Sequence, residues 1–298
     1  MALRYDIGEL ATAMITPFNK DYSIDYESVE KIAKYLIEEQ SNDAIVIAGT
    51  TGESPTLTHE EKQEILYCVK STNSGRVKII MGAGSNSTET AVKSSIKAKE
   101  LGADAILSVV PYYNKPSQQG MIEHFSAIAR AVDIPIILYN IQGRCGVDMA
   151  PSTIAFLAKE FDNIVALKQS NSNLDLISEI KTLAPDDFAI YSGDDSLTLP
   201  MLSIGADGVV SVASHVVGNE IKSMIRNYKS GQIDAASNMH RILYPIFKKI
   251  FMAPNPVPIK ALLSKIGLAQ NYVRRPLVEL GEQERLELLE CLNTIKMQ

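Results

Sequence analysis

The chain has 298 residues, a net charge of −6 and 46% hydrophobic residues, which is ample apolar material for a large buried core. This composition excludes intrinsic disorder, collagen and coiled coils. The acidic charge balance gives no electrostatic footprint for polyanions, so we expect no nucleic-acid partner. The length fits one or two domains, since α/β barrels of this size fold as single units.

The cysteines and the N-terminus bear on the location of the protein. Cys68, Cys145 and Cys291 are widely spaced and form no Cys-x-x-Cys pair, so neither a disulfide framework nor a zinc site is indicated. Arg4 and Asp6 interrupt any apolar signal sequence, and no later apolar run approaches the roughly 20 residues that span a bilayer. We therefore expect a cytoplasmic protein that contacts no membrane.

Short apolar runs rich in β-branched residues recur along the chain, separated by intervals long enough for a helix and two loops. They are Leu10–Ile15, Ala44–Ala48, Val77–Met81, Ala105–Val110, Ile134–Tyr139, Ile164–Leu167, Phe188–Tyr191 and Gly208–Val212. Runs that are apolar almost throughout are typical of parallel strands, which are buried on both faces.

The segments between these runs have helical patterns. Apolar residues recur at helical spacing between residues 29 and 37, which predicts an amphipathic helix. Thr58 and Glu61 have the spacing of a capping box, so a helix should begin there. After about residue 231 the strand pattern stops, and the remainder is typical of helices broken by the proline-rich segment 253–258.

Strand–helix units repeated in tandem predict an α/β fold, a (β/α)8 TIM barrel with a C-terminal helical extension. A doubly wound open sheet has the same alternating pattern, and periodicity alone does not decide whether the sheet closes. We expect the catalytic barrel to span residues 1–230 and the helical appendage to span residues 231–298.

In such a barrel the functional residues lie where the strands end. Lys168 ends the sixth apolar run, and burial makes a lysine amine a better nucleophile toward carbonyl compounds, with which it forms a Schiff base. Tyr139 ends the fifth run, one repeat earlier, so its phenol would lie beside the amine and could relay protons. An ion pair for the lysine and simple packing for the tyrosine are the alternatives.

Two loops after strands add polar groups. Thr50 and Thr51, in the turn 49–53 after the second run, place two hydroxyls that can bind a carboxylate or pass a proton. Arg144 follows Tyr139 in a glycine-containing loop, where a guanidinium can clamp a carboxylate through two hydrogen bonds. A plain turn of small residues and an ordinary surface arginine are the alternatives.

Other motifs are weak. The segment 81–84 is better explained by a tight strand–helix turn than by a phosphate loop. Asp194 and Asp195 are better explained as a helix N-cap before Leu197 than as metal ligands. The four histidines have no ligand spacing, so we expect no metal.

Taken together, these motifs resemble the dihydrodipicolinate synthase and N-acetylneuraminate lyase superfamily of pyruvate-dependent class I aldolases. The matching segments extend over nearly the whole chain: 16–18, 49–57, 111–116, 139–140, 143–144, 168, 192–195, 208–212 and 254–260. The double tyrosine of 111–113, Arg144 and the proline-rich segment before Lys260 are similar to the branch that joins pyruvate to aspartate semialdehyde, at the start of lysine and diaminopimelate synthesis.

The resemblance implies catalytic roles for four residues. Lys168 would form the Schiff base with pyruvate, with no metal and no organic cofactor. Tyr139, Thr50 and Tyr113 would make a proton relay, with Tyr113 reaching into the site of a neighbouring subunit. The resemblance also implies a homotetramer built as a dimer of tight dimers.

The resemblance implies substrate contacts as well. Thr51 would bind the pyruvate carboxylate, and Arg144 would hold the carboxylate of the semialdehyde. The backbone at Gly193 and Val210 would line the pocket. The chain departs from the family pattern at Gln169, where an acid is common, and at Gln142 and Cys145 near the arginine. These departures concern the second substrate rather than the pyruvate chemistry.

A possible effector cleft also follows from the resemblance. Ser54, His59, Asn86 and Tyr112 match the cleft at the tight-dimer interface in which lysine-inhibited relatives bind lysine. In this chain Lys62 and Thr90 replace a histidine and a glutamate of the sensitive relatives. An added ammonium and a lost carboxylate both disfavour a cationic ligand, so we hypothesise weak or absent inhibition by lysine.

Other functions remain as alternatives. Another pyruvate aldolase, an N-acetylneuraminate or keto-deoxy sugar acid lyase, would have no evident need for the carboxylate clamp at Arg144. A non-catalytic sensor of pyruvate or an amino acid would not need Lys168, Tyr139, Thr50 and Tyr113 together. A phosphate-binding barrel is disfavoured because strands seven and eight lack a convincing glycine-rich phosphate loop.

Overall fold

In the computed structural model, which describes residues 2–297, the strands follow one another around a closed barrel in chain order. They are β1 (Leu10–Ala13), β2 (Ala44–Ile47), β3 (Lys78–Gly82), β4 (Ala105–Val109), β5 (Ile136–Asn140), β6 (Ile164–Gln169), β7 (Ala189–Ser192) and β8 (Gly208–Ser211). Each lies at one of the predicted apolar runs. The (β/α)8 barrel is therefore confirmed, and the open doubly wound sheet is wrong.

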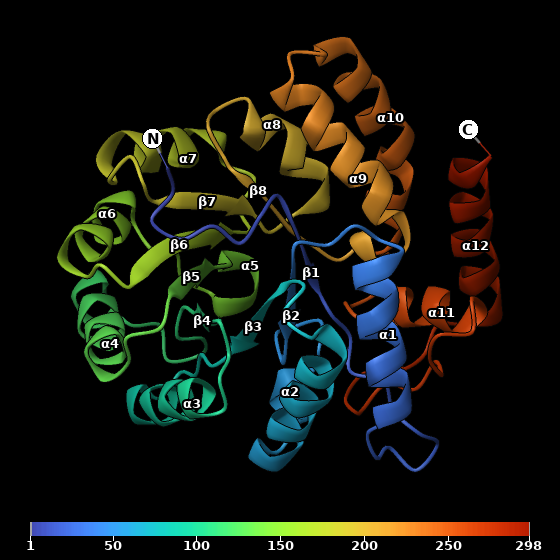
Figure 1. Cartoon of the computed structure of the whole chain (residues 1–298), viewed down its shortest axis with the longest axis horizontal. Coiled ribbons are helices and arrows are strands. Elements are labelled where there is room, and N and C mark those ends of the chain that lie inside the picture. The colour runs from blue at the N-terminus through green and yellow to red at the C-terminus, as the bar shows by residue number, and fades with distance from the viewer. Residues whose placement is uncertain (1, 298) are drawn as a thin grey trace. The chain divides into compact units, whose positions relative to one another are not determined.

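Helices alternate with the strands and continue after the last one (Figure 1). The α-helices are α1 (Tyr26–Glu38), α2 (His59–Asn73), α3 (Thr88–Glu100), α4 (Gln118–Ala131), α5 (Gln142–Cys145), α6 (Pro151–Glu160), α7 (Leu174–Leu183), α8 (Thr198–Leu202), α9 (Ser214–Lys229), α10 (Ile233–Lys249), α11 (Val257–Lys265) and α12 (Glu282–Lys296). Two short 3₁₀ helices are η1 (Ser54–Thr56) and η2 (Asp195–Leu197).

The predicted helix starts are confirmed. Thr58 caps α2 through its side chain, and the carboxylate of Glu61 accepts from the Thr58 backbone N–H at 2.9 Å, which completes the capping box. The side chain of Asp194 accepts from the N–H of Ser196 at 2.9 Å and caps η2, as predicted. The C-terminal helical extension is confirmed by α10, α11 and α12.

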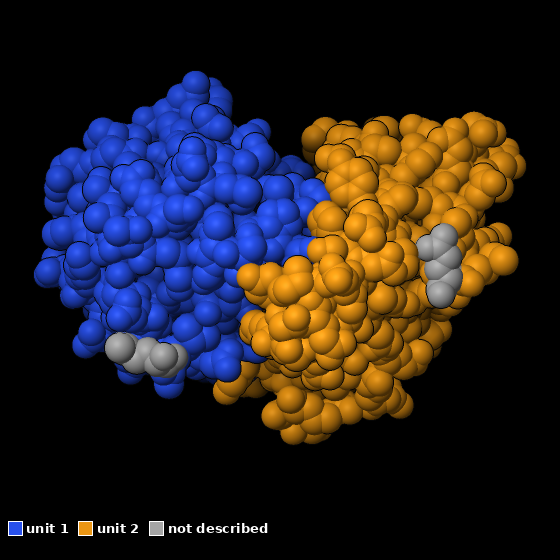
Figure 2. Space-filling view, turned by 90° about the horizontal axis from the view of Figure 1, so that it is seen from above, with its two compact units in different colours: residues 1–8, 80–210 blue, residues 9–79, 211–298 orange. Residues whose placement is uncertain are grey.

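The chain forms two compact units (Figure 2). Unit 1 comprises the described residues of Met1–Gly8 and Ile80–Val210. Unit 2 comprises Glu9–Ile79 and the described residues of Ser211–Gln298. The C-terminal helices therefore group with the first part of the barrel sequence, and the predicted boundary at residue 230 stays a prediction.

In unit 1, helices α3, α4, α6 and α7 lie on the outside of strands β4 to β7 (Figure 1). The strand register aligns the carboxyl ends of neighbouring strands. Tyr139 on β5 is the partner of Lys168 on β6, which in turn is the partner of Tyr191 on β7. Register partners on adjacent strands point to the same face of a sheet, so these three side chains share one face.

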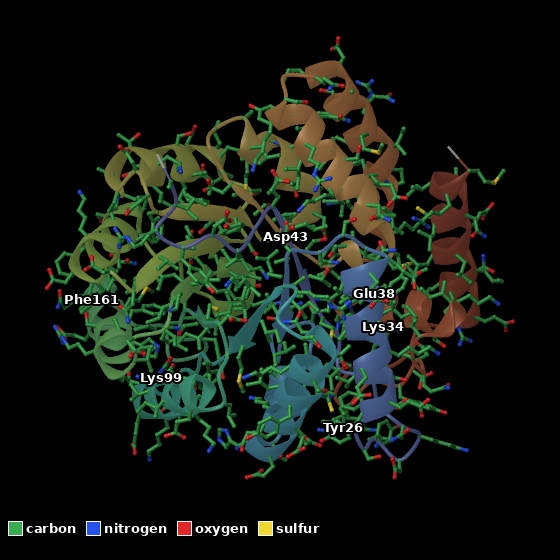
Figure 3. The ribbon with its side chains drawn as sticks, in the orientation of Figure 1. Tyr26, Lys34, Glu38, Asp43, Lys99 and Phe161 are labelled. Atoms are coloured by element: carbon green, nitrogen blue, oxygen red, sulfur yellow. The ribbon has the colours of Figure 1, made fainter. Side chains whose placement is uncertain are left out.

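In unit 2, an ionic cluster lies at the amino end of the strands. Asp43, directly before β2, accepts hydrogen bonds from the backbone N–H groups of Glu9 at 2.7 Å and Leu10 at 3.0 Å, and from the buried amine of Lys222. Figure 3 shows Asp43 near the amino end of β2 and Lys34 and Glu38 on α1. Charged groups at this end of a barrel serve stability rather than catalysis.

A fully buried histidine also belongs to unit 2. His215, on α9, accepts from the N–H of Ile15 through Nε2 at 3.2 Å and contacts the carbonyl of Val212 through Nδ1 at 2.8 Å. With Nε2 as the acceptor, Nδ1 carries the proton and donates. Burial lowers the pKa of His215 to about 4, because a charged imidazolium would lose its hydration.

We predict that the free energy of unfolding falls as the pH is lowered from about 6.5 toward 4. The neutral His215 is favoured in the folded state, so the unfolded chain binds the extra proton in this window. The free energy of unfolding therefore falls by on the order of 3 kcal/mol by pH 4. Urea unfolding at pH 7 and pH 5 measures the slope. His215→Gln should reduce it, whereas substitution of the exposed His59 by Gln should not. An unchanged slope in His215→Gln would contradict the prediction.

Candidate active site

The buried lysine predicted from the sixth apolar run lies beside the predicted tyrosine. Lys168 is 6% exposed and Tyr139 is 5% exposed. The Lys168 Nζ atom lies 4.2 Å from the centroid of the Tyr139 ring, so the amine rests over the face of the phenol. Among residues 2–297, Lys168 has no carboxylate partner. A buried amine without an acidic partner remains available for reaction with a carbonyl compound.

Gly193, directly after β7, allows another strand end to approach this lysine. A Cβ atom at Gly193 would lie 2.0 Å from Ser170 Oγ and 2.9 Å from Lys168 Cε. The absence of a side chain at this position therefore makes room for both groups. The hydroxyl of Ser170 is buried and has no hydrogen-bond partner in the described chain. Val210, the other predicted pocket position, lies on β8 and is 1% exposed.

The segment that carries Arg144 is anchored to the ends of β5 and β6. Asn140 donates from Nδ2 to Asp148 Oδ1 at 2.5 Å and accepts at Oδ1 from the N–H of Met149 at 3.1 Å. Asn171 donates to the other oxygen of Asp148 at 2.8 Å. Asp148 thus joins the two strand ends that carry Tyr139 and Lys168.

Arg144 lies on a short helix rather than in an irregular loop. Helix α5 spans Gln142–Cys145 and ends at Gly146, whose φ of 73° suits glycine. The Arg144 side chain is exposed and makes no ion pair within residues 2–297. Cys145 is buried, and burial raises the pKa of its thiol to about 11. An exposed guanidinium on an anchored segment can bind a carboxylate from solution.

Tyr113 lies on a strained loop of unit 1. Its side chain is 89% exposed and its φ is 71°, a left-handed conformation that is rare for an aromatic residue. Lys115, two residues later, has a φ of 45°. Asn114 fixes the loop by donating to the carbonyl of Asn86 at 2.8 Å. The loop therefore holds a large aromatic ring out in solvent.

In unit 2, the turn after β2 holds the two predicted threonines. Thr50 is half-buried, whereas Thr51 is 2% exposed. The hydroxyl of Thr51 is a hydrogen-bond acceptor for Nδ2 of Asn255 at 2.9 Å. A Cβ at Gly52 would lie 3.2 Å from the backbone N of Ala48, so the tight turn favours a residue without a side chain there.

The same turn ends in a buried ion pair. Glu53 has a φ of 54°, and its Oε1 accepts from Nζ of Lys260 at 2.5 Å. The two side chains are 2% and 0% exposed. Lys260 also donates to the carbonyl of Tyr272 at 2.9 Å. Burial lowers the pKa of Lys260 to about 8, although the Glu53 carboxylate opposes that shift.

Arg274 extends this network. Its backbone N–H donates to Glu53 Oε2 at 2.9 Å, and its guanidinium pairs with Glu61 at 2.5 Å. This pairing lowers the pKa of the Glu61 carboxyl. The Phe18 ring has Lys260 Nζ at 4.0 Å and the Arg274 guanidinium carbon at 4.5 Å from its centroid. The C-terminal segment 255–274 therefore supports the turn of Thr50 and Thr51 at several points.

Sequence reasoning assigned no role to several residues of the site. Ser170 and Asp148 had no motif of their own. Asn255 was part of the segment that carries the family resemblance, but its partner Thr51 lies 204 positions away. Gln169, noted as a departure from the family, is fully buried, and neither polar atom of its side chain has a partner among residues 2–297.

The predicted effector residues are divided between the units. Ser54 begins η1 and His59 begins α2 in unit 2, whereas Asn86 and Tyr112 belong to unit 1. Lys62 on α2 is half-buried, and burial lowers its pKa. Lys62 makes no ion pair in the described part of the chain.

Residues 2–297 contain no group of three or more histidine, cysteine, aspartate or glutamate side chains placed to hold a metal ion. None of the helices described is both long and apolar enough to cross a membrane.

A closed barrel with a buried lysine at a strand end, beside a phenol, defines a class of barrel enzyme that can react with carbonyl compounds through an amine. The model of the dihydrodipicolinate synthetase family matches residues 6–295. The chain belongs to this family, and the resemblance found in the sequence is confirmed.

Curated relatives support the same assignment. The 4-hydroxy-tetrahydrodipicolinate synthase of Bacillus subtilis is 47% identical over 291 residues, which cover 97% of this chain and 100% of the relative. The enzyme named 4-hydroxy-tetrahydrodipicolinate synthase 1 of Halalkalibacterium halodurans is 48% identical over 288 residues and 97% of both chains.

Solved structures have the same fold over the whole length. A DHDPS structure from Cyanidioschyzon merolae with lysine bound has a TM-score of 0.95 and 44% identity, covering 98% of this chain and 99% of that one. A dihydrodipicolinate synthase from Acinetobacter baumannii, described as chloride inhibited and complexed with pyruvate, has a TM-score of 0.94 and 35% identity, covering 98% and 100%.

We predict that Gly193→Ala slows reaction of the Lys168 amine with an α-keto acid by about 10-fold or more, because the added methyl displaces Ser170 Oγ and Lys168 Cε. The rate at which the borohydride-trapped adduct forms, followed by intact-protein mass spectrometry, measures this effect. The double variant Gly193→Ala/Ser170→Ala should recover part of the rate. Gly143→Ala is the matched control, since its methyl would meet nothing within 4 Å. Equal rates in all four proteins would refute the prediction.

Proposed function

We propose that this chain condenses pyruvate, held as a Schiff base on Lys168, with L-aspartate 4-semialdehyde to form 4-hydroxy-tetrahydrodipicolinate, for lysine and diaminopimelate biosynthesis. The observation that carries the proposal is the buried amine of Lys168, which lies over the Tyr139 ring at the end of a barrel strand and has no carboxylate partner among residues 2–297. It is supported by full-length relatives that carry this activity as their name.

The chemistry follows from the amine. The neutral amine of Lys168 attacks the ketone of pyruvate, and loss of water from the carbinolamine leaves an imine. The imine nitrogen withdraws electrons, so the pyruvate methyl group loses a proton and becomes an enamine. The enamine carbon attacks the aldehyde of the second substrate. The amino group of the adduct then attacks the imine carbon, closes the ring and releases the lysine.

The proton transfers in this series of reaction steps need a relay. Tyr139 lies against the amine and can pass protons to and from the carbinolamine oxygen. We assign the remaining steps of the relay to Thr50 and to Tyr113 of a neighbouring subunit. The 89% exposure of Tyr113 in a strained loop supports a role outside its own subunit.

The carboxylates of the two substrates need separate binding groups. We assign the pyruvate carboxylate to Thr51 and the semialdehyde carboxylate to Arg144, whose guanidinium makes no ion pair in the described chain. The backbone at Gly193 and Val210 completes the pocket in this proposal. A Cβ atom at Gly193 would lie 2.9 Å from Lys168 Cε, so the close approach of this backbone to the lysine supports its place there.

Assembly and location belong to the same proposal. We infer a homotetramer from the family resemblance and from the exposed Tyr113. One similar structure, with a TM-score of 0.95 and 36% identity, is described as a monomeric dihydrodipicolinate synthase variant. The three cysteines are free thiols, which supports a reducing cytoplasm.

We predict that pyruvate and borohydride add one reduced pyruvate to the intact protein, and that Lys168→Ala abolishes the adduct. Lys159→Ala, which removes an exposed lysine of the same unit, should leave the adduct unchanged. Aspartate semialdehyde added before the borohydride should lower the adduct, because it consumes the enamine. Intact-protein mass spectrometry measures all three results.

Two outcomes would redirect the proposal. An adduct that the semialdehyde leaves unchanged, with turnover of sugar acids instead, would identify a sugar acid lyase. No adduct in the wild-type protein would exclude Schiff-base chemistry and favour a pyruvate or amino-acid sensor.

We also propose that lysine inhibits this enzyme weakly or not at all. The half-buried ammonium of Lys62, which makes no ion pair within residues 2–297, belongs to the residues that correspond to the lysine cleft, and Thr90 offers no carboxylate. A cationic ligand would gain no ion pair from either residue and would be repelled by Lys62.

We predict that half-inhibition by lysine requires more than millimolar concentrations. The double variant Lys62→His/Thr90→Glu should lower that concentration about 10-fold or more, because it removes one positive charge and adds one negative charge. Steady-state turnover at increasing lysine measures the effect, with Lys70→His on the same helix as control. Half-inhibition of the wild type below millimolar lysine would contradict the hypothesis.

A further inference from the structure

A hydrogen bond connects the turn after β2 to the proline-rich segment of the C-terminal part. Nδ2 of Asn255 lies 2.9 Å from Oγ1 of Thr51. Thr51 is 2% exposed and Asn255 is 8% exposed, so water does not compete freely for either group. Both residues belong to unit 2.

The chemistry of the two groups sets the direction of this hydrogen bond. An amide NH₂ group can only donate, so the Thr51 oxygen accepts from Asn255 through a lone pair. The threonine hydroxyl has one proton, which therefore cannot be directed at Asn255. The hydrogen bond leaves the hydroxyl as a donor toward any acceptor on its other side.

The acceptor atom of the Asn255 amide is not used within residues 2–297. Its Oδ1 atom is buried and has no hydrogen-bond partner among residues 2–297. Buried polar atoms without a partner are rare, and in a native protein each calls for an explanation. The protein therefore uses the donor of this amide and leaves its acceptor uncommitted.

We propose that Asn255 is a positioning residue that holds the Thr51 hydroxyl in the orientation that donates to the carboxylate of pyruvate. The inference rests on the proposed function, in which Thr51 binds that carboxylate. With the opposite orientation, the Thr51 hydroxyl would donate its proton to residue 255, and its oxygen lone pairs would face the negatively charged substrate.

The location of the turn does not depend on Asn255. Gly52 is tied by its carbonyl to Thr16 Oγ1 at 2.8 Å, and Glu53 is tied to Lys260 at 2.5 Å. Substitution of Asn255 should therefore change the direction of the Thr51 hydroxyl while the backbone stays in place. This separation makes an orientational role testable.

The experiment measures the pyruvate concentration that gives half-maximal borohydride-trapped adduct on Lys168, together with kcat at saturating pyruvate. The variants are Asn255→Ala, Asn255→Asp, Thr51→Val and the doubles of Thr51→Val with each. Asn255→Asp retains Oδ1 and replaces only the donor Nδ2 by an acceptor, so it should reverse the hydrogen bond to Thr51.

We expect Asn255→Ala to raise the half-saturating pyruvate concentration about 5- to 10-fold, and Asn255→Asp to raise it more, with kcat changed by less than about 3-fold. In the Thr51→Val background, Asn255→Ala should change nothing further, because its effect acts through the missing hydroxyl. The loss caused by Asn255→Asp should also shrink in that background. Any remainder measures direct repulsion by the new carboxylate.

Asn42→Ala is the matched control. Asn42 forms another buried threonine–asparagine hydrogen bond of unit 2, in which Thr12 donates to Asn42 at 2.5 Å. Its loss should lower stability without raising the half-saturating pyruvate concentration. A rise equal to that of Asn255→Ala would indicate a general structural effect and overturn the inference.

Two further outcomes overturn it. Wild-type affinity in Asn255→Asp would mean that Thr51 donates to residue 255, and effects of Asn255→Ala and Thr51→Val that multiply would mean that the residues act independently. Either result leaves the wild-type adduct, and thus the proposed function, intact. Absence of an adduct in the wild type would refute both.

Discussion

The buried ion pair between Glu53 and Lys260 is the interaction on which the threonine turn depends. Removing two charges from water is expensive, and the pair offsets that expense only with good geometry and additional hydrogen bonds. Both conditions hold, because Lys260 also donates to Tyr272 and Glu53 also accepts from the Arg274 backbone. The same pair holds Glu53 in a left-handed conformation that its side chain disfavours.

In unit 1, the carboxylate of Asp148 has the role that Glu53 has in unit 2. Asp148 accepts from Asn140 on β5 and from Asn171 after β6, so the short helix with Arg144 is tied to the strand ends that bear Tyr139 and Lys168. In both units an acidic side chain bonded on each oxygen fixes a segment that carries a substrate-binding candidate. Groups held in this way need little rearrangement when a charged ligand arrives.

Much of this architecture could be predicted from sequence because it is periodic. The eight apolar runs predict the strands, and the one-repeat spacing of Tyr139 and Lys168 predicts neighbouring strand ends. The register Tyr139–Lys168 confirms that reasoning. The capping box at Thr58 depends only on residues three positions apart, so it could also be predicted from the sequence.

The remaining features depend on contacts that leave no pattern in the sequence. Asn255 and Thr51 lie 204 positions apart, and neither residue type signals the other. The Ser170 hydroxyl occupies the space beside Gly193 because the two residues follow the paired ends of β6 and β7. The segment with Arg144 was expected to be a loop, but α5 forms there because glycine at 146 can end one helical turn.

The discontinuous make-up of unit 2 bears on the order in which the protein matures during synthesis. Its first part ends at residue 79, and its second part begins at residue 211. The threonine turn leaves the ribosome early, but its supports at Asn255, Lys260 and Arg274 are made only after all of unit 1. A nascent chain therefore forms these three supports of the turn only after unit 1 has been synthesised, and a chain that stops before residue 255 lacks all of them.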